Sequence, residues 1–423
     1  MDKILQDVVR FLFDFVLFYP CIMSPIWVLG AIYYYFHWEK KEDLDHTRTP
    51  ELTEYPFVSI IVPCYNEGKH IVETTGFLTK LNYPSYEIIL VDDGSTDNTA
   101  EQIKHLVNTY PQVRAIYLKE NQGKATAMRW GSLAASAEFL VCIDGDAVLD
   151  PNCLHWLIKQ FLENPRVGAV TGNPRVRNRT TLIGKIQIGE FSSIIGVIKR
   201  AQRIYGKIFT VSGVVAAFRK AALHDVGYWN TDMATEDVDI SWKLQLRFWN
   251  IHFEPNALCW VLMPETLAGL YKQRLRWAQG GAEVFLRYLG KMLRDIRYIR
   301  MVPIAIEYMA GAIWAYCVWT ITILFILGQI VDLPNYLQIK SIVPTWTGAL
   351  IALICLIQFL AGFLIDRRFE KDVFHYYFWI IWYPAIYWLI NAVTIVVALP
   401  KAIIRKKGKL AVWDSPDRGE HNE

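Results

Sequence analysis

Residues 86–97 read YEIILVDDGSTD, in which an apolar run rich in β-branched side chains ends in acidic and small polar residues. Similar apolar runs occur at residues 57–62, 113–118 and 138–143, and helical patterns separate them. This alternation is typical of an open, mostly parallel sheet with helices on both faces. The sequence therefore predicts an α/β domain over residues 56–262.

Polar motifs follow three of these four runs. Tyr65 and Glu67 come after the first run, Asp93 after the second, and the Asp144-Gly-Asp146 triplet after the fourth. Ligands of open parallel sheets bind beyond the carboxyl ends of the strands. These side chains are therefore predicted to share one binding site.

The two ends of the chain are more apolar than its middle, and the 423 residues have a mean hydropathy of +0.19. Residues 1–14 have the charge spacing of an amphipathic helix on a membrane surface, and residues 15–36 are long enough to cross. We expect residues 1–37 to hold this helix and span, and residues 38–55 to form a polar linker. The basic residues of the linker predict that it and the α/β domain lie in the cytoplasm.

The segment 263–300 is basic and aromatic, which favours helices at the membrane surface over a crossing. Three apolar stretches with the length of a transmembrane helix follow, at 302–330, 346–365 and 374–399. We expect three crossings within 301–400 and a polar tail at 401–423. Three crossings would leave the tail outside, whereas its lysines and arginines favour the inside. A stretch that does not fully cross is the alternative.

Charge and cysteine content exclude some classes of function. The net charge is only +3, so a nucleic-acid partner is not expected. The seven cysteines are scattered, without the spacing of a metal site or a redox pair. They are interpreted as reduced structural thiols of a cytosolic or membrane protein.

Asp144 and Asp146 stand two residues apart in an extended segment, so both carboxylates point to the same side. A nucleotide diphosphate brought beside them would be repelled by about 1–4 kcal/mol per charge pair. A divalent cation removes this repulsion, and Mg²⁺ or Mn²⁺ prefers carboxylate and phosphate oxygens. The pair therefore predicts a metal-assisted nucleotide-sugar site, with an acidic turn as the alternative.

Asp93 and Lys124 are candidate nucleotide contacts. Asp93 lies where a strand turns into a helix, and its carboxylate can accept the imide proton of uracil. Lys124 follows Asn121-Gln-Gly at a predicted helix start, where it could meet the nucleotide. The alternatives are a capped turn around Asp93 and a solvated side chain for Lys124.

Asp237 follows Glu236 and precedes a predicted helix at 238–249. A sugar hydroxyl is a poor nucleophile at neutral pH, and a carboxylate within hydrogen-bond reach can remove its proton as the new bond forms. A helix start holds such a carboxylate in place, so Asp237 is the candidate base. Helix capping is the alternative, and Thr235 or Glu236 would suit it better.

Residues 273–277 read QRLRW and stand where the α/β domain meets the membrane segments. Arg274 and Arg276 can clamp a diphosphate, and Trp277 can stack on an acceptor sugar. Gln273 completes this candidate set. Anchoring at the membrane interface is the alternative for such a motif.

The order Asp93, DGD, TED and QRLRW resembles the signature of the membrane-bound processive synthases of glycosyltransferase family 2. The resemblance covers nearly the whole chain and is closest to the bacterial synthases of poly-β-1,6-N-acetylglucosamine in biofilms. This narrower match is carried by residues 141–147, 170–175, 189–196, 209–219, 240–246, 272–280 and 414–418.

The resemblance implies a GT-A fold, UDP-N-acetylglucosamine as donor, a growing poly-N-acetylglucosamine chain as acceptor, and inverting transfer assisted by Mg²⁺ or Mn²⁺. By position, it implies that Asp93 contacts the uridine and Asp144 the nucleotide, while Asp146 holds the metal. It also implies that Asp237 deprotonates the acceptor 6-hydroxyl.

The same resemblance places Arg276 and Trp277 at the junction of donor and acceptor. It implies a bacterial cytoplasmic (inner) membrane protein that exports its polymer and has a small two-span membrane partner. Cyclic di-GMP activates some relatives, but this sequence has no receptor motif for it, so such control would need the partner. The single leading span departs from relatives that have two.

Other functions fit part of the sequence. Chitin and hyaluronan synthases share the motif order, and a single-transfer lipid-linked glycosyltransferase shares the first acidic motifs but should lack QRLRW. A non-enzymatic membrane scaffold should have lost an acid among Asp144, Asp146 and Asp237, and all three are present. The sequence therefore favours a processive synthase.

Overall fold

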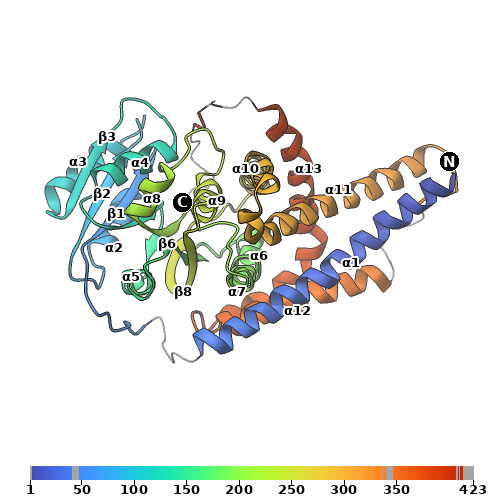
Figure 1. The fold of residues 1–423 in the computed structure, drawn as a ribbon, viewed down its shortest axis with the longest axis horizontal. Helices are drawn as coiled ribbons and strands as arrows, with labels where there is room; N and C mark the ends of the chain where they lie inside the picture. The colour runs from blue at the N-terminus through green and yellow to red at the C-terminus, as the bar shows by residue number, and fades with distance from the viewer. Residues whose placement is uncertain are drawn as a thin grey trace.

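The computed structural model of the chain describes residues 2–40, 47–335, 337–339, 346–405, 408 and 410–412. An α/β body holds most of the chain, and long helices project from one side of it as an arm (Figure 1). Parts of the expected linker and polar tail lie outside the described residues, as does the 414–418 segment of the family resemblance.

The α/β body is built on one eight-stranded sheet in the order β3-β2-β1-β4-β7-β6-β8-β5. The strands are β1 Val58–Cys64, β2 Tyr86–Asp92, β3 Val113–Tyr117, β4 Phe139–Ile143, β5 Val148–Leu149, β6 Val167–Val176, β7 Val215–Arg219 and β8 Asn250–Val261. Strands β1 to β4 are parallel, as are β6 and β8. The predicted α/β class and its four strands are confirmed, although β7 and β5 run antiparallel to their neighbours.

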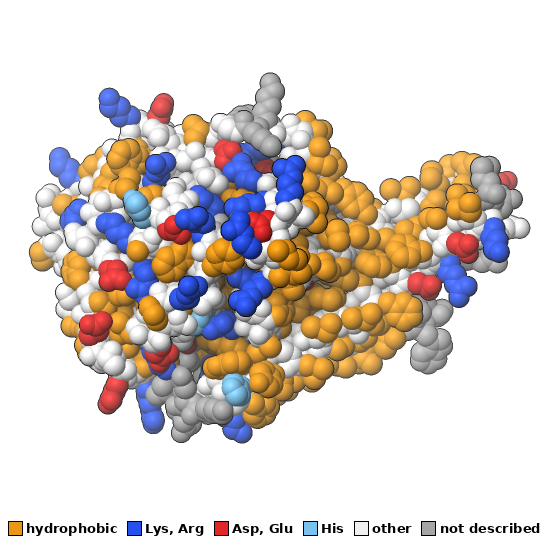
Figure 2. Space-filling view, viewed as in Figure 1, with side chains coloured by type: hydrophobic (Ala, Val, Ile, Leu, Met, Phe, Trp, Pro, Cys, Tyr) orange, Lys and Arg blue, Asp and Glu red, His pale blue; other side chains and the backbone are white. Residues whose placement is uncertain are grey.

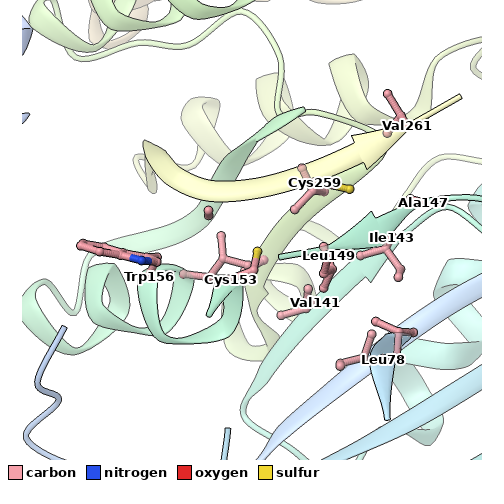
Figure 3. Close-up of a cluster of buried hydrophobic side chains, with 14 of the residues drawn as sticks. Leu78, Val141, Ile143, Ala147, Leu149, Cys153, Trp156, Cys259 and Val261 are labelled. Carbon is pink, nitrogen blue, oxygen red and sulfur yellow. The ribbon is translucent and has the colours of Figure 1, made fainter. Parts of the chain in front are cut away.

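Helices cover both faces of the sheet, which explains why its strands read as continuous apolar runs. They are α2 Ile71–Leu78, α3 Thr99–Thr109 and α5 Cys153–Glu163 on one face, and α4 Lys124–Ala134, α8 Lys220–Val226 and α9 Glu236–Leu246 on the other. Ile60 packs into the first core and its neighbour Ile61 into the second. Figure 3 shows part of the first core, to which α5 contributes Cys153 and Trp156 and the strands contribute Val141 and Cys259.

Three helical segments of the described chain are long and apolar enough to cross a membrane. They lie in α1 (Asp2–Tyr34) with its π-helical extension Tyr35–Glu39, in η3 (Ile296–Met301) with α11 (Val302–Ile330), and in α12 (Trp346–Asp366). The expected surface helix and the first span form one continuous helix, α1. The arm presents a broad apolar belt (Figure 2).

Shorter helices lie between the arm and the body (Figure 1). They are α6 (Leu182–Glu190), η2 (Phe191–Val197) and α7 (Ile198–Ile204), and the longer α10 (Leu267–Arg294) carries the QRLRW motif. Helix α10 is amphipathic, as expected for an interfacial helix.

The third expected crossing, at 374–399, is not a single long helix. It divides into the 3₁₀ helix η4 (Val373–Trp382), the π-helical turn η5 (Tyr383–Tyr387) and the 17-residue helix α13 (Trp388–Ile404). Pro384 stands at the start of η5 and lacks the N–H that a continuing α-helix would need. Within the described chain, two helical segments after the α/β body are long and apolar enough to cross, and the third expected crossing stays a prediction.

The chain after α13 returns to the α/β body. Arg405 pairs with Glu283 of α10 at 2.7 Å, and the N–H of Ala411 donates to the carbonyl of Thr231 at 2.9 Å. These contacts place the end of the described chain on the same side as the body. This is the side that the basic residues of the tail favour.

A buried ion-pair network joins the arm to the body. Arg200 of α7 lies 2.6 Å from Glu39, at the end of the π-helical extension of α1, and 3.1 Å from Asp366, at the end of α12. Arg175 of β6 lies 2.6 Å from the same Asp366 and 2.5 Å from Glu370. Breaking such a buried pair leaves an uncompensated charge, so the network holds both helices in one orientation on the body.

Candidate active site

The carboxyl ends of β1, β2 and β4 bring the predicted loops together. The N–H of Asp93 donates to the carbonyl of Cys64 at 2.8 Å, which joins the first two loops. A Cβ placed on Gly145 would lie 2.9 Å from Cγ of Glu67, so only glycine allows the DGD loop to approach so closely. Glu67 is buried and Tyr65 half-buried in the same loop.

Asp93 is a fully buried carboxylate that organises the loop before α4. Its Oδ1 accepts the N–H of Gln122 at 2.9 Å, and its Oδ2 accepts the N–H of Gly123 at 2.8 Å. Burial raises the pKa of Asp93 to about 6, although both hydrogen bonds act in the opposite direction. Asp93 thus supports the loop that leads to Lys124. A uracil ring bound here would have to share the carboxylate oxygens of Asp93 with these two backbone amides.

Lys124, the first residue of α4, connects the acidic motifs. Its Nζ lies 2.5 Å from Oδ1 of Asp144 and 3.1 Å from Oε1 of Glu236, and it donates to the carbonyl of Gly213 at 3.1 Å. Burial disfavours the charge, but the two carboxylates outweigh it and raise the pKa of Lys124. Its side chain is only 12% exposed, so Lys124 is not a solvated surface lysine.

Asp237 stands half-buried at the start of α9, beside this cluster. Its Oδ1 accepts the N–H of Val238 at 2.8 Å, and its Oδ2 faces Gly213, where an added Cβ would lie 3.1 Å away. Burial and the neighbouring Glu236 raise the pKa of Asp237 to about 6. A small cavity of about 10 Å³ is lined by Asp237, Glu236 and the loop at 211–213.

Glu236 has the opposite electrostatic setting. Burial alone would raise the pKa of Glu236, but Lys124 and local hydrogen bonds outweigh it and lower this pKa. Thr235 precedes α9 but makes no side-chain capping bond to it. Glu236 therefore lies in an ion pair with Lys124, whereas Asp237 next to it is a carboxylate of raised pKa.

The QRLRW motif lies on α10, and its first arginine pairs with a glutamate outside the acidic cluster. Arg274 is buried, forms an ion pair with Glu190 of α6, and lies over the Trp277 ring at 4.2 Å from its centroid. It also donates to Oε1 of Gln273 at 3.1 Å. The guanidinium is engaged inside the protein as the counter-charge of buried Glu190, and the predicted diphosphate contact of Arg274 stays a prediction.

Arg276 and Trp277 are both exposed on α10. Burial has the largest effect on the pKa values of Glu236 and Asp237, and it raises both. The positive charge of Arg276 acts in the opposite direction and lowers the pKa of each carboxylate. Arg276 is therefore the arginine of the motif that acts on the acidic cluster.

Sequence reasoning missed how α10 holds the TED loop. A Cβ on Gly280 would lie 1.9 Å from Oγ1 of Thr235. The helix and the TED loop can therefore pack this closely only because residue 280 has no side chain. Three residues later, Oε2 of Glu283 accepts the N–H of Ala234 at 3.1 Å. The Gly280-Gly281 pair inside a long helix was the available signal, since glycine weakens a helix unless packing requires it.

The acidic motifs offer carboxylate oxygens as possible ligands for a metal ion. Among the residues that the structure describes, no three His, Cys, Asp or Glu side chains form a metal-binding cluster. Mg²⁺ at phosphate sites is usually held by one or two carboxylates, with substrate phosphates and water as the remaining ligands. The two carboxylates of Asp144 and Asp146 fit that donor set.

Comparisons with known proteins agree with this architecture. Residues 59–227 match the family model described as glycosyl transferase family 2. A poly-beta-1,6-N-acetyl-D-glucosamine synthase of Staphylococcus epidermidis is 43% identical over 408 residues, covering 96% of this chain and 98% of that protein. A synthase of the same name from Staphylococcus aureus (strain COL) is 42% identical over 407 residues, with the same coverage.

A solved structure shares the fold at low sequence identity. The mannosyltransferase PcManGT from Pyrobaculum calidifontis, in complex with GDP-Man and Mn²⁺, has a TM-score of 0.57 and 20% identity. The match covers 90% of this chain and 99% of that chain, and it confirms the GT-A type of fold. Together with the full-length relatives, it makes the chain a membrane-associated glycosyltransferase that belongs to family 2, among the poly-beta-1,6-N-acetyl-D-glucosamine synthases.

Proposed function

We propose that this enzyme polymerises N-acetylglucosamine from UDP-N-acetylglucosamine into β-1,6-linked poly-N-acetylglucosamine, with inversion at the anomeric carbon, and exports the product. The observation that carries the proposal is the position of Asp237, a carboxylate of raised pKa beside the Lys124–Glu236 ion pair. One ionised group at the mouth of a nucleotide site is what a direct displacement by a sugar hydroxyl requires.

The donor is proposed to lie over the strand ends. Its uridine would contact the loop of Tyr65 and Glu67 and the Asp93-supported loop at 121–123. Lys124 would reach the diphosphate, because its ammonium already lies between two carboxylates at this edge. Asp144 would orient the nucleotide through the same lysine.

We propose Asp146 as the protein ligand of a Mg²⁺ or Mn²⁺ ion that is shared with the diphosphate. When bound, the ion would neutralise the leaving UDP and assist its departure. The Mn²⁺ in PcManGT, which shares the fold, supports a divalent ion without deciding between the two metals.

The transfer is proposed to be a single displacement. The proton of the acceptor 6-hydroxyl passes to Oδ2 of Asp237, which has no hydrogen-bond donor among the described residues. As the O6–C1 bond forms, the bond between C1 and the phosphate oxygen breaks, and UDP leaves with the electron pair. Attack from the face opposite UDP turns an α-linked donor into a β-linked product.

The acceptor end is proposed to lie against α10, with Trp277 stacking on the terminal sugar and with Gln273 and Arg276 beside it. The exposure of Trp277 and the charge of Arg276 on the acidic cluster support this placement. The product would then pass along the membrane helices of a protein held in the cytoplasmic (inner) membrane, with the α/β body in the cytoplasm. A small two-span membrane partner would complete this path, and cyclic di-GMP control would act through that partner.

Product analysis tests the proposal. Purified membranes with the full chain are supplied with labelled UDP-N-acetylglucosamine, UDP-glucose or UDP-glucuronic acid, beside membranes with Asp237→Asn. We expect a long polymer only from UDP-N-acetylglucosamine, cleaved by a β-1,6-specific hexosaminidase and absent with Asp237→Asn. A polymer resistant to that enzyme would indicate a chitin or hyaluronan type of synthase, and a single transferred sugar would indicate a lipid-linked glycosyltransferase.

A further inference from the structure

A second cavity lies at the junction of the body and the arm. It has a volume of about 250 Å³ and is lined by α9, by the start of β8 and by η3, the segment that leads into α11. Four of its lining residues are basic: Arg166, Lys207, Arg297 and Arg300. None of the described residues that line it is acidic, so the cavity concentrates positive charge.

Lys207 is the residue that points to a ligand. Its side chain is only 7% exposed, and among the described residues its Nζ has no hydrogen-bond or ion-pair partner. Burial and the nearby Arg300 lower the pKa of Lys207. Asp295 compensates Arg297 at 2.6 Å, but no such pair compensates Lys207 within the described chain. Because this mostly buried lysine has no described counter-charge, an anion bound in the cavity would stabilise its charged form.

The surroundings of the cavity indicate which anion. Leu293, Ile296 and Ile299 are exposed apolar side chains in the same segment, directly before the membrane helix α11. Figure 2 shows basic side chains gathered beside the apolar belt of the arm. A phosphate bound by Lys207 would thus lie at the level of lipid headgroups, with apolar surface beside it for acyl chains.

We propose that this cavity binds the phosphate of an anionic phospholipid headgroup. Lys207 and Arg300 would bind the phosphate oxygens, and the acyl chains would lie along Ile296, Ile299 and the start of α11. The lipid would fix the level at which the body sits on the membrane. The site shares no residue with the acidic cluster, so it stands independently of the proposed reaction.

Lipid binding to the purified full chain tests this site. The protein in neutral detergent is titrated with labelled phosphatidylglycerol or phosphatidylcholine, and with inorganic phosphate as the competitor. We expect a preference for phosphatidylglycerol that Lys207→Gln and Arg300→Gln each weaken about tenfold, as expected for one lost charged hydrogen bond. The conservative Lys207→Arg should retain binding.

Two controls keep the outcome decisive. Arg294→Gln removes an exposed charge of the neighbouring α10 that does not line the cavity, and it should bind phosphatidylglycerol like the unaltered protein. Lys207→Gln should not lower the melting temperature without lipid, because the ammonium has no described partner to lose. Arg300→Gln alters an exposed side chain, so it gives a second measurement of lipid binding in a variant whose fold should be unaffected. Equal binding of both lipids, or unchanged binding by both variants, would overturn the proposal. If inorganic phosphate displaced phosphatidylglycerol with equal affinity, the cavity would instead be assigned as a site for free phosphate.

Discussion

Nζ of Lys124 lies 2.5 Å from Oδ1 of Asp144, so the first side chain of α4 is bound directly to the DGD loop. The same ammonium lies 3.1 Å from Glu236, at the start of α9. One cation therefore joins the nucleotide loop, the proposed metal loop and the loop of the proposed base. The charge of Lys124 favours the ionised form of the Asp237 carboxylate, so we expect the proposed base to depend on this lysine.

Polymer synthesis should fall as the pH drops through about 6. The pKa of Asp237 is raised to about 6 by burial and by Glu236, and only its ionised form can accept the proton. Removing Lys124 takes away a charge that lowers this pKa, so Lys124→Gln should move the acid limb to higher pH. It should also weaken UDP-sugar binding about tenfold. Initial rates across pH 5–8 measure both effects.

Lys119→Gln, at an exposed lysine just before the loop, is the matched control and should keep the original profile. An unchanged acid limb in Lys124→Gln would show that Lys124 does not influence the base.

Asp146→Asn should abolish the dependence of donor binding on divalent cations. The substitution removes a carboxylate ligand but keeps the side-chain volume, so the fold should remain. Calorimetric titration of UDP with Mg²⁺, with Mn²⁺ and with EDTA measures this dependence. The unaltered protein should bind UDP more tightly with metal, and Asp146→Asn should bind it equally weakly in all three conditions. Retained enhancement by metal would remove Asp146 from the metal site.

Gly280→Ala should impair the enzyme although it adds only one methyl group. The new Cβ would meet Oγ1 of Thr235 at 1.9 Å, so α10 and the TED loop must move apart. Such overpacking typically costs about 1–3 kcal/mol, and the shift would displace Asp237 as well. Thermal unfolding and polymer synthesis measure the two effects.

Gly290→Ala provides the comparison on the same helix, since nothing lies within 4 Å of the added atom. It should be neutral or slightly stabilising, because alanine favours a helix over glycine. Equal behaviour of the two variants would show that the contact at Gly280 is not restrictive.

The two arginines of QRLRW should separate into different roles. Arg274→Met leaves Glu190 buried without its partner, which we expect to cost about 3–5 kcal/mol of stability. Arg276→Gln removes an exposed side chain, so it should leave the melting temperature unchanged while lowering polymer synthesis. Thermal unfolding and turnover of both variants, measured side by side, check this division. A stable but inactive Arg274→Met would instead support the predicted contact of Arg274 with the substrate.

A reporter fused after Glu423 should be located in the cytoplasm. Arg405 pairs with Glu283, and Ala411 binds Thr231, so the chain after α13 lies on the side of the α/β body. A reporter inserted after Asp332, between α11 and α12, should be located outside. Paired alkaline phosphatase and green fluorescent protein fusions at both sites measure this. Opposite sides for Glu423 and the body would support a third crossing after the α/β body.

Much of the α/β body could be predicted because its signals are local. The runs at 57–62, 86–91, 113–118 and 138–143 are strands of the sheet, since each lies between helices and is apolar on both faces. The antiparallel strands β5 and β7 were not predicted. Strand β5 has only two residues, and the direction of β7 depends on its neighbours β4 and β6.

The sequence alone determined which chemical groups stand at the strand ends and in what order, because a motif that follows a strand is placed by that strand. Only the tertiary structure decided how these groups are used. Arg274 turns to Glu190, Lys124 bridges Asp144 and Glu236, and Arg405 returns the chain to α10. Each of these pairs joins residues that are far apart in the chain, and local spacing carries no information about which buried charge will meet which.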